Sequence, residues 1–131
     1  MEIDPSVRAL LLGVMKVFPD VGKRMKRCAR EIGGVSFSTT RMMNEFSLMT
    51  SEAMRDRNEQ VVQAHLSYVS NLLIGANEKV HEYIDVYYVE ELMYDLDEQS
   101  KQWGWFRIPE NLRALYVAMW GQPSFLKPPS L

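Results

Sequence analysis

Residues 80–96, VHEYIDVYYVEELMYDL, carry apolar side chains at spacings of three and four residues, which is the spacing of one face of an α-helix. One face holds Val80, Tyr83, Ile84 and Tyr87, and a second face, on a different side, holds Val86, Val89, Met93 and Leu96. A helix that is apolar on two sides must be covered on two sides. The segment therefore predicts a buried helix over about residues 78–97, at the centre of a helical bundle.

The same segment has an alternative secondary structure. Residues 83–89 are rich in β-branched and aromatic side chains, which favour strands. We prefer the helix because the three- and four-residue spacing continues through Leu92, Met93 and Leu96, whereas strand propensity depends strongly on context.

Capping residues predict two helices near the N-terminus. Asp4 and Pro5 indicate the start of a first helix, which should end before Pro19 because proline disfavours helical geometry in the residue before it. Asp20 is the expected N-cap of a second helix, and Gly33 is its expected end because glycine readily adopts a left-handed conformation.

Three more helices are expected in addition to the central one. A short helix should surround residues 42–49, and Thr50 is the expected N-cap of a long helix over 50–75. Asn77 is the expected N-cap of the central helix. After a loop over 97–108, a last helix is expected over 109–121.

These elements define an all-α fold. We expect a single-domain bundle of five or six helices over residues 1–121, followed by an extended tail over 122–131. The sequence contains no apolar run long enough to cross a membrane and no secretory signal pattern. Its one cysteine, Cys28, cannot form an internal disulfide, which fits a reducing compartment. We therefore expect a cytoplasmic protein.

The formal net charge of −2 hides an uneven distribution. Residues 1–57 hold ten basic and seven acidic side chains, whereas residues 58–131 hold five basic and ten acidic ones. The basic residues concentrate in the second helix, at Lys23, Arg24, Lys26, Arg27 and Arg30. The acidic residues concentrate at Glu78, Glu82, Asp85, Glu90, Glu91, Asp95, Asp97 and Glu98. Such a chain is expected to have one positive and one negative face.

Motifs for common enzyme and cofactor sites are missing from the sequence. No glycine pattern for phosphate binding occurs, and one cysteine with two histidines does not make a zinc site. Neither an HExxH motif nor a nucleophile elbow is present. The sequence therefore predicts no cofactor, no metal and no catalytic residue, and we expect a protein that is not an enzyme.

Three polar residues interrupt the apolar lines of the predicted helices. Asn58 and His65 lie on the long helix and Glu90 lies on the central helix. Because buried polar groups are usually satisfied inside a protein, the simpler interpretation is a structural hydrogen-bond network that fixes the register of the helices. The alternative is a general acid–base pair of His65 and Glu90 in a cleft.

The expected loop contains three large aromatic residues, Trp103, Trp105 and Phe106. Two placements are open. The rings can fold over the bundle as part of the core, or they can form an exposed binding site of the kind in which tryptophan is enriched.

An acidic row runs along the predicted central helix, where Glu78, Glu82 and Asp85 fall on one side. Like charges in a row mildly destabilise a helix, and a basic partner would remove this repulsion and be attracted to the row. We expect the partner-binding surface to combine the row with later carboxylates and the aromatic loop: Glu78, Glu82, Asp85, Glu91, Asp95, Trp103, Trp105 and Phe106.

The basic second helix supports an alternative partner. Its five cations lie within residues 23–30 and would bind phosphates in a salt-dependent way, as in a nucleic-acid-associated regulator. The net negative charge of the chain and the missing recognition-helix motif argue against nucleic acid. A solvated or internally paired face is the simpler interpretation.

Asn58, His65, residues 83–92 with an aromatic-Val-Glu-x-Leu motif at 88–92, and residues 109–115 together form a pattern that spans about residues 50–120. In this pattern the chain resembles a group of small bacterial all-α domains of unassigned function. Related small proteins are commonly immunity proteins encoded beside secreted toxins. The resemblance implies that the partner is a cognate bacterial toxin, whose basic catalytic cleft would be occluded by the acidic row.

Overall fold

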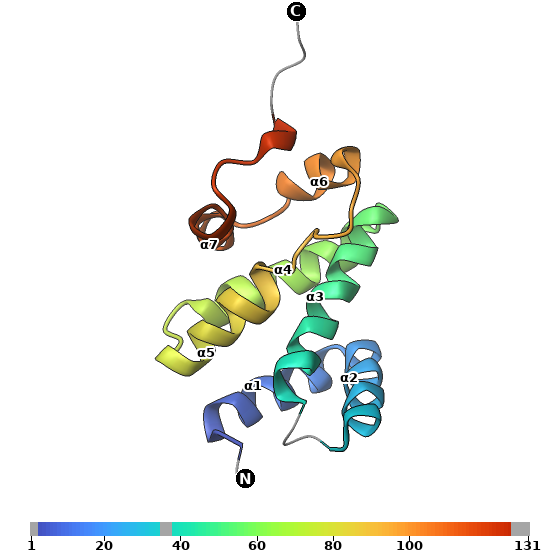
Figure 1. Cartoon of the computed structure of the whole chain (residues 1–131), viewed down its shortest axis with the longest axis vertical. Helices are drawn as coiled ribbons and strands as arrows, with labels where there is room; N and C mark the ends of the chain where they lie inside the picture. Colours follow the sequence, from blue (N-terminus) through green and yellow to red (C-terminus); the bar gives the residue numbers. More distant parts are fainter. Residues whose placement is uncertain (1–2, 35–37, 127–131) are drawn as a thin grey trace, which may run out of the picture.

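The computed structural model describes residues 3–34 and 38–126 of the chain. These residues form seven α-helices, a π-helical segment and a 3-10 turn: α1 (Pro5–Val17), α2 (Pro19–Ile32), α3 (Thr39–Arg55), α4 (Glu59–Leu73), α5 (Glu78–Glu82), η2 (Tyr83–Val89), α6 (Glu98–Trp105), α7 (Glu110–Trp120) and η3 (Ser124–Leu126). α1 and α2 lie at one end of the molecule and α6 and α7 at the other, with α3 running between them (Figure 1).

The predicted all-α class is confirmed. The described part of the chain contains no strand, and residues 83–89 are helical, so the strand alternative is wrong. The helices are more numerous than the five or six expected, because the predicted loop over 97–108 contains α6. One cluster of buried hydrophobic side chains extends from Val7 in α1 to Phe125 in η3, so the elements form a single domain.

The first two helices begin and end close to their predicted positions. Asp4 caps α1 through its side chain, and α1 ends before Pro19. α2 starts at Pro19 itself with Phe18 as its N-cap, so the prediction of Asp20 as N-cap is wrong. Asp20 lies instead in the first turn, where a negative charge is favoured by the helix dipole. Gly33 ends α2 in the left-handed conformation, as predicted.

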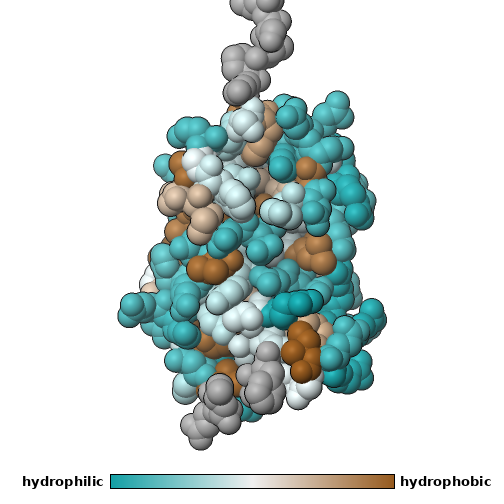
Figure 2. Space-filling view, in the orientation of Figure 1, coloured by the Kyte–Doolittle hydropathy of each residue, from teal (hydrophilic) through white to brown (hydrophobic). Residues whose placement is uncertain are grey.

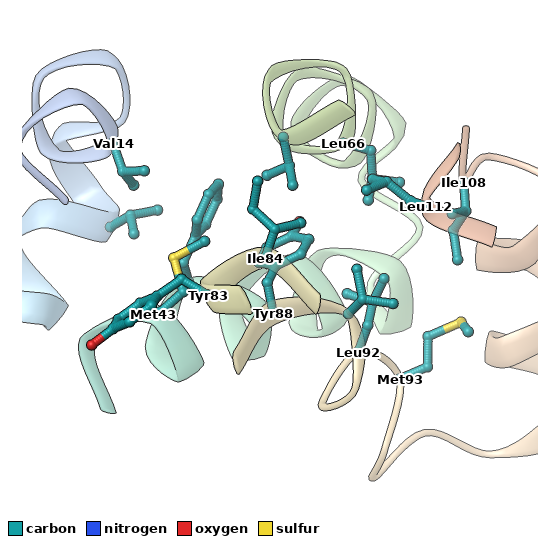
Figure 3. Packing of buried hydrophobic residues seen from close by; sticks show 14 of the residues in the cluster. Val14, Met43, Leu66, Tyr83, Ile84, Tyr88, Leu92, Met93, Ile108 and Leu112 are labelled. Carbon is teal, nitrogen blue, oxygen red and sulfur yellow. The ribbon is translucent and has the colours of Figure 1, made fainter. Parts of the chain in front are cut away.

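α3 is the element around which the others pack. It contacts α1, α2, α4, α6 and η2, and it contributes fully buried side chains such as Met43, Phe46 and Met54. The segment predicted at the centre packs against α3 and is buried as expected, with Ile84 and Tyr88 inside the core (Figure 3). The prediction of a buried segment is therefore right, but the centre of the bundle is α3.

The predicted long helix over 50–75 does not exist as one element. α3 continues through Thr50, which is fully buried and is not an N-cap. Inside the helix the Thr50 hydroxyl lies 3.1 Å from the carbonyl oxygen of Phe46, one turn earlier. Back-bonding of this kind lets a hydroxyl residue sit within a helix, because its polar group is satisfied there.

The chain breaks between α3 and α4 at Arg57, whose φ of 57° is left-handed. The backbone N–H of Asn58 donates to Ala53 (2.8 Å) and that of Arg57 donates to Met54 (3.1 Å), which satisfies the last carbonyls of α3. The Asn58 side chain then caps α4 by accepting from Val61 N–H (3.3 Å). Glycine is the usual residue at such a position, so the arginine found there gives no sequence signal that the helix ends.

The helix predicted over 78–97 is shorter than expected. From Tyr83 it is π-helical, since the N–H of Glu90 donates to the carbonyl of Asp85, five residues earlier (3.0 Å). Residues five apart therefore lie on one side of η2 and are buried together, Tyr83 with Tyr88 and Ile84 with Val89.

Two hydroxyls of α3 hold the end of η2. Ser47 donates to the carbonyl of Tyr88 (2.6 Å), and Ser51 accepts from the N–H of Met93 (2.9 Å). These bonds satisfy buried backbone groups that have no partner within the helix. The chain can therefore turn at residues 90–95, although this segment contains no glycine or proline.

α6 replaces the loop predicted over 97–108. Asp97 caps it by accepting from Ser100 N–H (2.8 Å). Gly104 lets α6 approach α3 closely, because a Cβ at this position would lie 2.5 Å from the sulfur of Met54. α7 confirms the predicted last helix, with Gly121 as its C-cap.

The tail predicted to be extended over 122–131 is helical at Ser124–Leu126. Phe125 is buried there, with its ring centroid 6.0 Å from that of Trp105. The domain therefore continues past Gly121, and residues 127–131 lie outside the described residues.

Candidate functional site

The predicted acidic row lies along α5 and the start of η2. Glu78 is exposed, whereas Glu82 and Asp85 are half-buried. The ammonium of Lys79 lies 3.2 Å from the Glu82 carboxylate, and this hydrogen bond raises the pKa of Lys79. The protein therefore relieves part of the like-charge repulsion within the helix itself.

A second acidic surface forms where α3 meets the turn over 90–95. We call it the acidic cleft; it encloses about 340 Å³ and is lined by Asn44, Leu48, Ser51, Glu52, Arg55, Glu91, Tyr94, Asp95 and Leu96. It thus brings together Glu91 and Asp95, two of the predicted partner-binding residues, with an α3 face that the sequence did not indicate.

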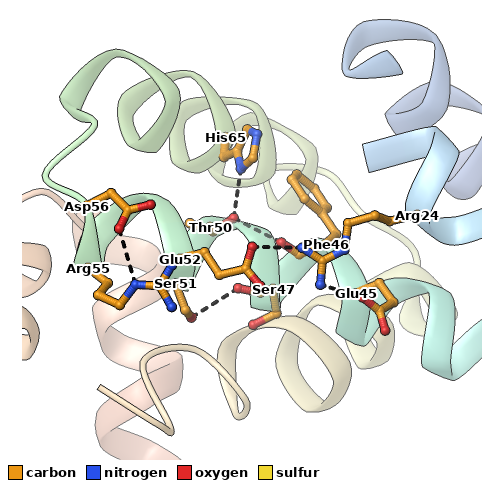
Figure 4. Close-up of polar contacts among 10 residues, drawn as sticks. All are labelled: Arg24, Glu45, Phe46, Ser47, Thr50, Ser51, Glu52, Arg55, Asp56 and His65. Carbon is orange, nitrogen blue, oxygen red and sulfur yellow. Dashed lines mark hydrogen bonds and ion pairs between the residues drawn. The ribbon is translucent and has the colours of Figure 1, made fainter. Parts of the chain in front are cut away.

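The charges of the acidic cleft are unevenly paired. Glu52 is bound by Arg24 (2.7 Å), and Arg55 is bound by Asp56 (3.2 Å), as Figure 4 shows. Glu91 and Asp95 are exposed and have no ion-pair partner among the described residues. These two carboxylates are free to attract a cation.

Asn44 adds an unsatisfied acceptor to the acidic cleft. Its Oδ1 atom is buried and has no hydrogen-bond partner in the part of the chain that the structure describes. A buried acceptor without a donor costs about 1–3 kcal/mol, and this cost falls on the part of α3 that lines the acidic cleft.

Two exposed aromatic rings lie beside the acidic cleft. Tyr94 is 66% exposed and Trp120 is 49% exposed, and their ring centroids are 6.4 Å apart. The indole N–H of Trp120 donates to the backbone carbonyl of Glu90 (3.0 Å), which fixes the ring beside the turn. The sequence did not indicate this pair, because Tyr94 lies on an apolar line of the predicted central helix and leaves it only when the chain turns.

The three rings of residues 103–106 have different environments. Trp105 is 7% exposed and packs against Tyr116 (centroids 5.4 Å apart), so it belongs to the core and is not accessible to a partner, contrary to its prediction as a binding residue. Trp103 is half-buried, with the Arg107 guanidinium 3.6 Å from its ring centroid. Only Phe106 of the three is well exposed, at 69%.

The basic helix keeps most of its predicted cations at the surface. Lys23, Lys26, Arg27 and Arg30 line a groove of about 560 Å³, which we call the basic groove. Arg24 points elsewhere: it binds Glu45 (3.0 Å) and Glu52 (2.7 Å) of α3 and so joins α2 to α3 (Figure 4). Arg24 is thus a structural residue, whereas the other four remain available to an anion.

The buried polar network differs from the predicted one. His65 is 4% exposed, and its Nδ1 lies 2.9 Å from the hydroxyl of Thr50, which in turn lies 2.8 Å from the hydroxyl of Tyr88. Burial lowers the pKa of His65 to about 4, so the ring is neutral at physiological pH. The sequence missed Thr50 because it was interpreted as a helix cap.

The predicted grouping of Asn58, His65 and Glu90 is therefore wrong. Asn58 is exposed and caps α4, and Glu90 contributes a backbone carbonyl to Trp120. Within residues 3–34 and 38–126, no hydrogen bond joins His65 to Glu90, because α3 supplies the partner of His65. The acid–base pair considered as the alternative is not assembled either.

Residues 3–34 and 38–126 contain neither a metal site nor a membrane-spanning helix. No group of three or more His, Cys, Asp or Glu residues there could hold a metal ion. None of the described helices has the length and apolar character that crossing a membrane requires. On the face shown in Figure 2, hydrophobic residues lie scattered between hydrophilic ones.

Comparison with known proteins places the chain in a family. No curated protein and no solved structure matches it at a significant level. A family described as Domain of unknown function (DUF7674) matches residues 13–121, which include the acidic cleft, the basic groove and the His65 network. Because the match covers most of the chain, this protein belongs to that family, the domain of unknown function DUF7674.

Proposed function

We propose that this protein is a non-enzymatic binding protein that recognises a basic partner protein through the acidic cleft. More specifically, the protein would be a cytoplasmic immunity protein that neutralises a cognate bacterial toxin by covering the toxin's active site. The observation that carries the proposal is the combination, at one place, of two unpaired carboxylates with two exposed aromatic rings.

The chemistry of the acidic cleft fits an arginine or lysine side chain. Glu91 and Asp95 are exposed and supply carboxylate acceptors. The faces of Tyr94 and Trp120 attract a cation electrostatically, by about 0.5–2 kcal/mol for a cation held over a ring. Tyrosine and tryptophan also dominate the binding energy of many protein interfaces.

Charge complementarity also supports the immunity proposal. A toxin that cleaves or binds nucleic acid has a basic catalytic cleft, and opposite charges accelerate the encounter of two proteins. The acidic row at Glu78, Glu82 and Asp85 adds negative charge on the same chain segment. An inhibitor that must reach its toxin before damage occurs would benefit from a faster association rate of this kind.

Co-expression with the product of the neighbouring gene tests the proposal. We expect the chain to rescue cells from that product's toxicity and to co-purify with it. The double variant Glu91→Lys/Asp95→Lys should weaken the complex by at least tenfold in a calorimetric titration, because charges close to a basic partner become repulsive. Glu31→Lys, on the exposed surface of α2, is the matched control and should leave affinity unchanged. No rescue and no complex would refute the immunity proposal.

A second candidate function rests on the basic groove. Its four cations have no ion-pair partner among the described residues, and they converge on one surface. A regulator that binds nucleic acid through four phosphate contacts would lose about a hundredfold in affinity between 50 and 200 mM salt. Fluorescence anisotropy with a generic DNA duplex tests this: Lys26→Glu/Arg27→Glu should abolish binding, whereas Lys16→Glu on α1 should not. Undetectable binding of the unmodified protein at 50 mM salt would reject the candidate.

A further inference from the structure

A pocket opens above His65 at the junction of α1, α2, α3 and α4. We call it the His65 pocket; it has a volume of about 290 Å³ and is lined by Val17, Phe18, Pro19, Asp20, Val21, Met49, Gln60, Val61, Ala64 and His65. Its lining is mostly apolar, with Asp20 and Gln60 as exposed polar groups at the rim. None of the residues assigned to the acidic cleft or to the basic groove takes part in it.

The hydrogen bonds around Thr50 fix the protonation of His65. The hydroxyl of Tyr88 is fully buried and has Thr50 as its partner, so it donates to Thr50. The single Thr50 proton can then go either to the Phe46 carbonyl or to Nδ1 of His65. In the first arrangement, Thr50 donates to the Phe46 carbonyl and Nδ1–H of His65 donates to Thr50, so each of the three contacts of the Thr50 hydroxyl contains a proton. In the second, Thr50 donates to Nδ1, and the contact between Thr50 and the Phe46 carbonyl has no proton. The first arrangement is therefore favoured.

This arrangement leaves Nε2 of His65 with a free lone pair. The ring is held edge-on to Phe18 and Phe46, with centroids 4.6 and 5.0 Å away, and Nδ1 points at Thr50 (Figure 4). Nε2 has no hydrogen-bond partner within the described residues, although His65 is 96% buried. Because burial keeps the pKa of His65 at about 4, Nε2 is an acceptor at physiological pH.

We propose that the His65 pocket binds a small aromatic molecule whose hydroxyl group donates a hydrogen bond to Nε2 of His65. Phe18 contributes an aromatic ring to the lining and Met49 a thioether, and both groups make favourable contacts with an aromatic ring. Cavities of about 150 Å³ hold one benzene ring, so this pocket accommodates one ring with its substituents. A hydroxyl fits better than a carboxylate, because a neutral imidazole that presents a lone pair repels an anion.

Phenol and toluene test this directly, since they share a ring and differ in the hydroxyl. Titration of the ¹⁵N-labelled protein should shift amide resonances of residues around the pocket with both ligands, and phenol should bind about fivefold more tightly, as one hydrogen bond predicts. Long-range ¹H–¹⁵N spectra should show an unprotonated Nε2 in the free protein, and its resonance should move when phenol binds. Absence of binding, equal affinity for the two ligands, or a protonated Nε2 in the free protein would each overturn the proposal.

Three variants locate the binding. Ala64→Phe places a ring in the mouth of the pocket from the exposed side of α4 and should abolish binding of both ligands, whereas Gln63→Phe, one residue outside the lining, should not. His65→Leu should equalise the affinities for phenol and toluene. Should that variant fail to fold, the Ala64→Phe comparison and the tautomer spectrum still decide, and phenol binding that survives Ala64→Phe would place the ligand elsewhere.

Discussion

Acidification should destabilise this protein through His65. Its pKa is about 4 in the folded state because burial disfavours the charged ring, whereas the unfolded chain should have the ordinary value of about 6.5. Between these values the unfolded state binds a proton and the folded state does not, so stability rises with pH. The contribution is complete above about pH 6.5 and is lost as the pH falls toward 4.

The magnitude follows from the difference between the two pKa values. Linkage gives a loss of about 2 kcal/mol between pH 7 and 5, and about 3 kcal/mol between pH 7 and 4. For a domain whose total stability is about 5–15 kcal/mol, this is a large fraction. Carboxylates also titrate in this range, so the effect of the histidine must be isolated by comparison.

Urea unfolding at pH 7, 6 and 5 provides the assay. We expect His65→Gln to lose about 2 kcal/mol less than the unmodified protein between pH 7 and 5, whatever its stability at pH 7, because glutamine does not titrate. His81 is exposed, so His81→Gln should keep the full pH dependence. Equal pH dependence in His65→Gln and in the unmodified protein would refute the claim that burial keeps His65 neutral.

Three further predictions concern stability, measured by the free energy of unfolding in urea. Trp105→Ala should cost about 3–5 kcal/mol because the ring is core, whereas Phe106→Ala should change stability by less than about 0.5 kcal/mol because that ring is exposed. Arg24→Met should cost about 1 kcal/mol by removing the ion pairs between α2 and α3, and the cost should shrink in high salt. Tyr88→Phe should cost about 1 kcal/mol, because its buried hydroxyl bonds to Thr50.

Each of these predictions has a clear contrary result. Similar losses for Trp105→Ala and Phe106→Ala would mean that the two rings share one environment. A cost for Arg24→Met that does not depend on salt would assign its effect to packing of the side-chain stem. A neutral Tyr88→Phe would show that the hydroxyl of Tyr88 is not needed to satisfy Thr50.

Site residues that lie close together in the sequence could be predicted, whereas site residues that come together from distant parts of the chain could not. Glu91 and Asp95 were predicted as binding residues from charge alone, and the structure places them in one cleft. The face opposite them comes from α3, and Trp120 comes from α7, thirty residues beyond the carbonyl that it binds. No pattern within either segment indicates such a pairing.

The sequence by itself determined the helical class and the starts of those helices whose capping side chain bonds to its own first turn. Asp4 and Asn77 bond to backbone groups within three residues of themselves, so their role can be read from neighbouring positions. The spacing of apolar residues likewise reports on one helix at a time, and it identified Ile84 and Val89 as core.

The tertiary structure decided where helices stop and which polar groups meet. η2 ends where Ser47 and Ser51 of α3 satisfy its backbone, about forty residues earlier in the chain, and His65 is neutral because Thr50 and the surrounding rings enclose it. Such contacts depend on which helix faces come together during packing. Local propensity therefore predicts the elements, but the contacts between them set the site chemistry.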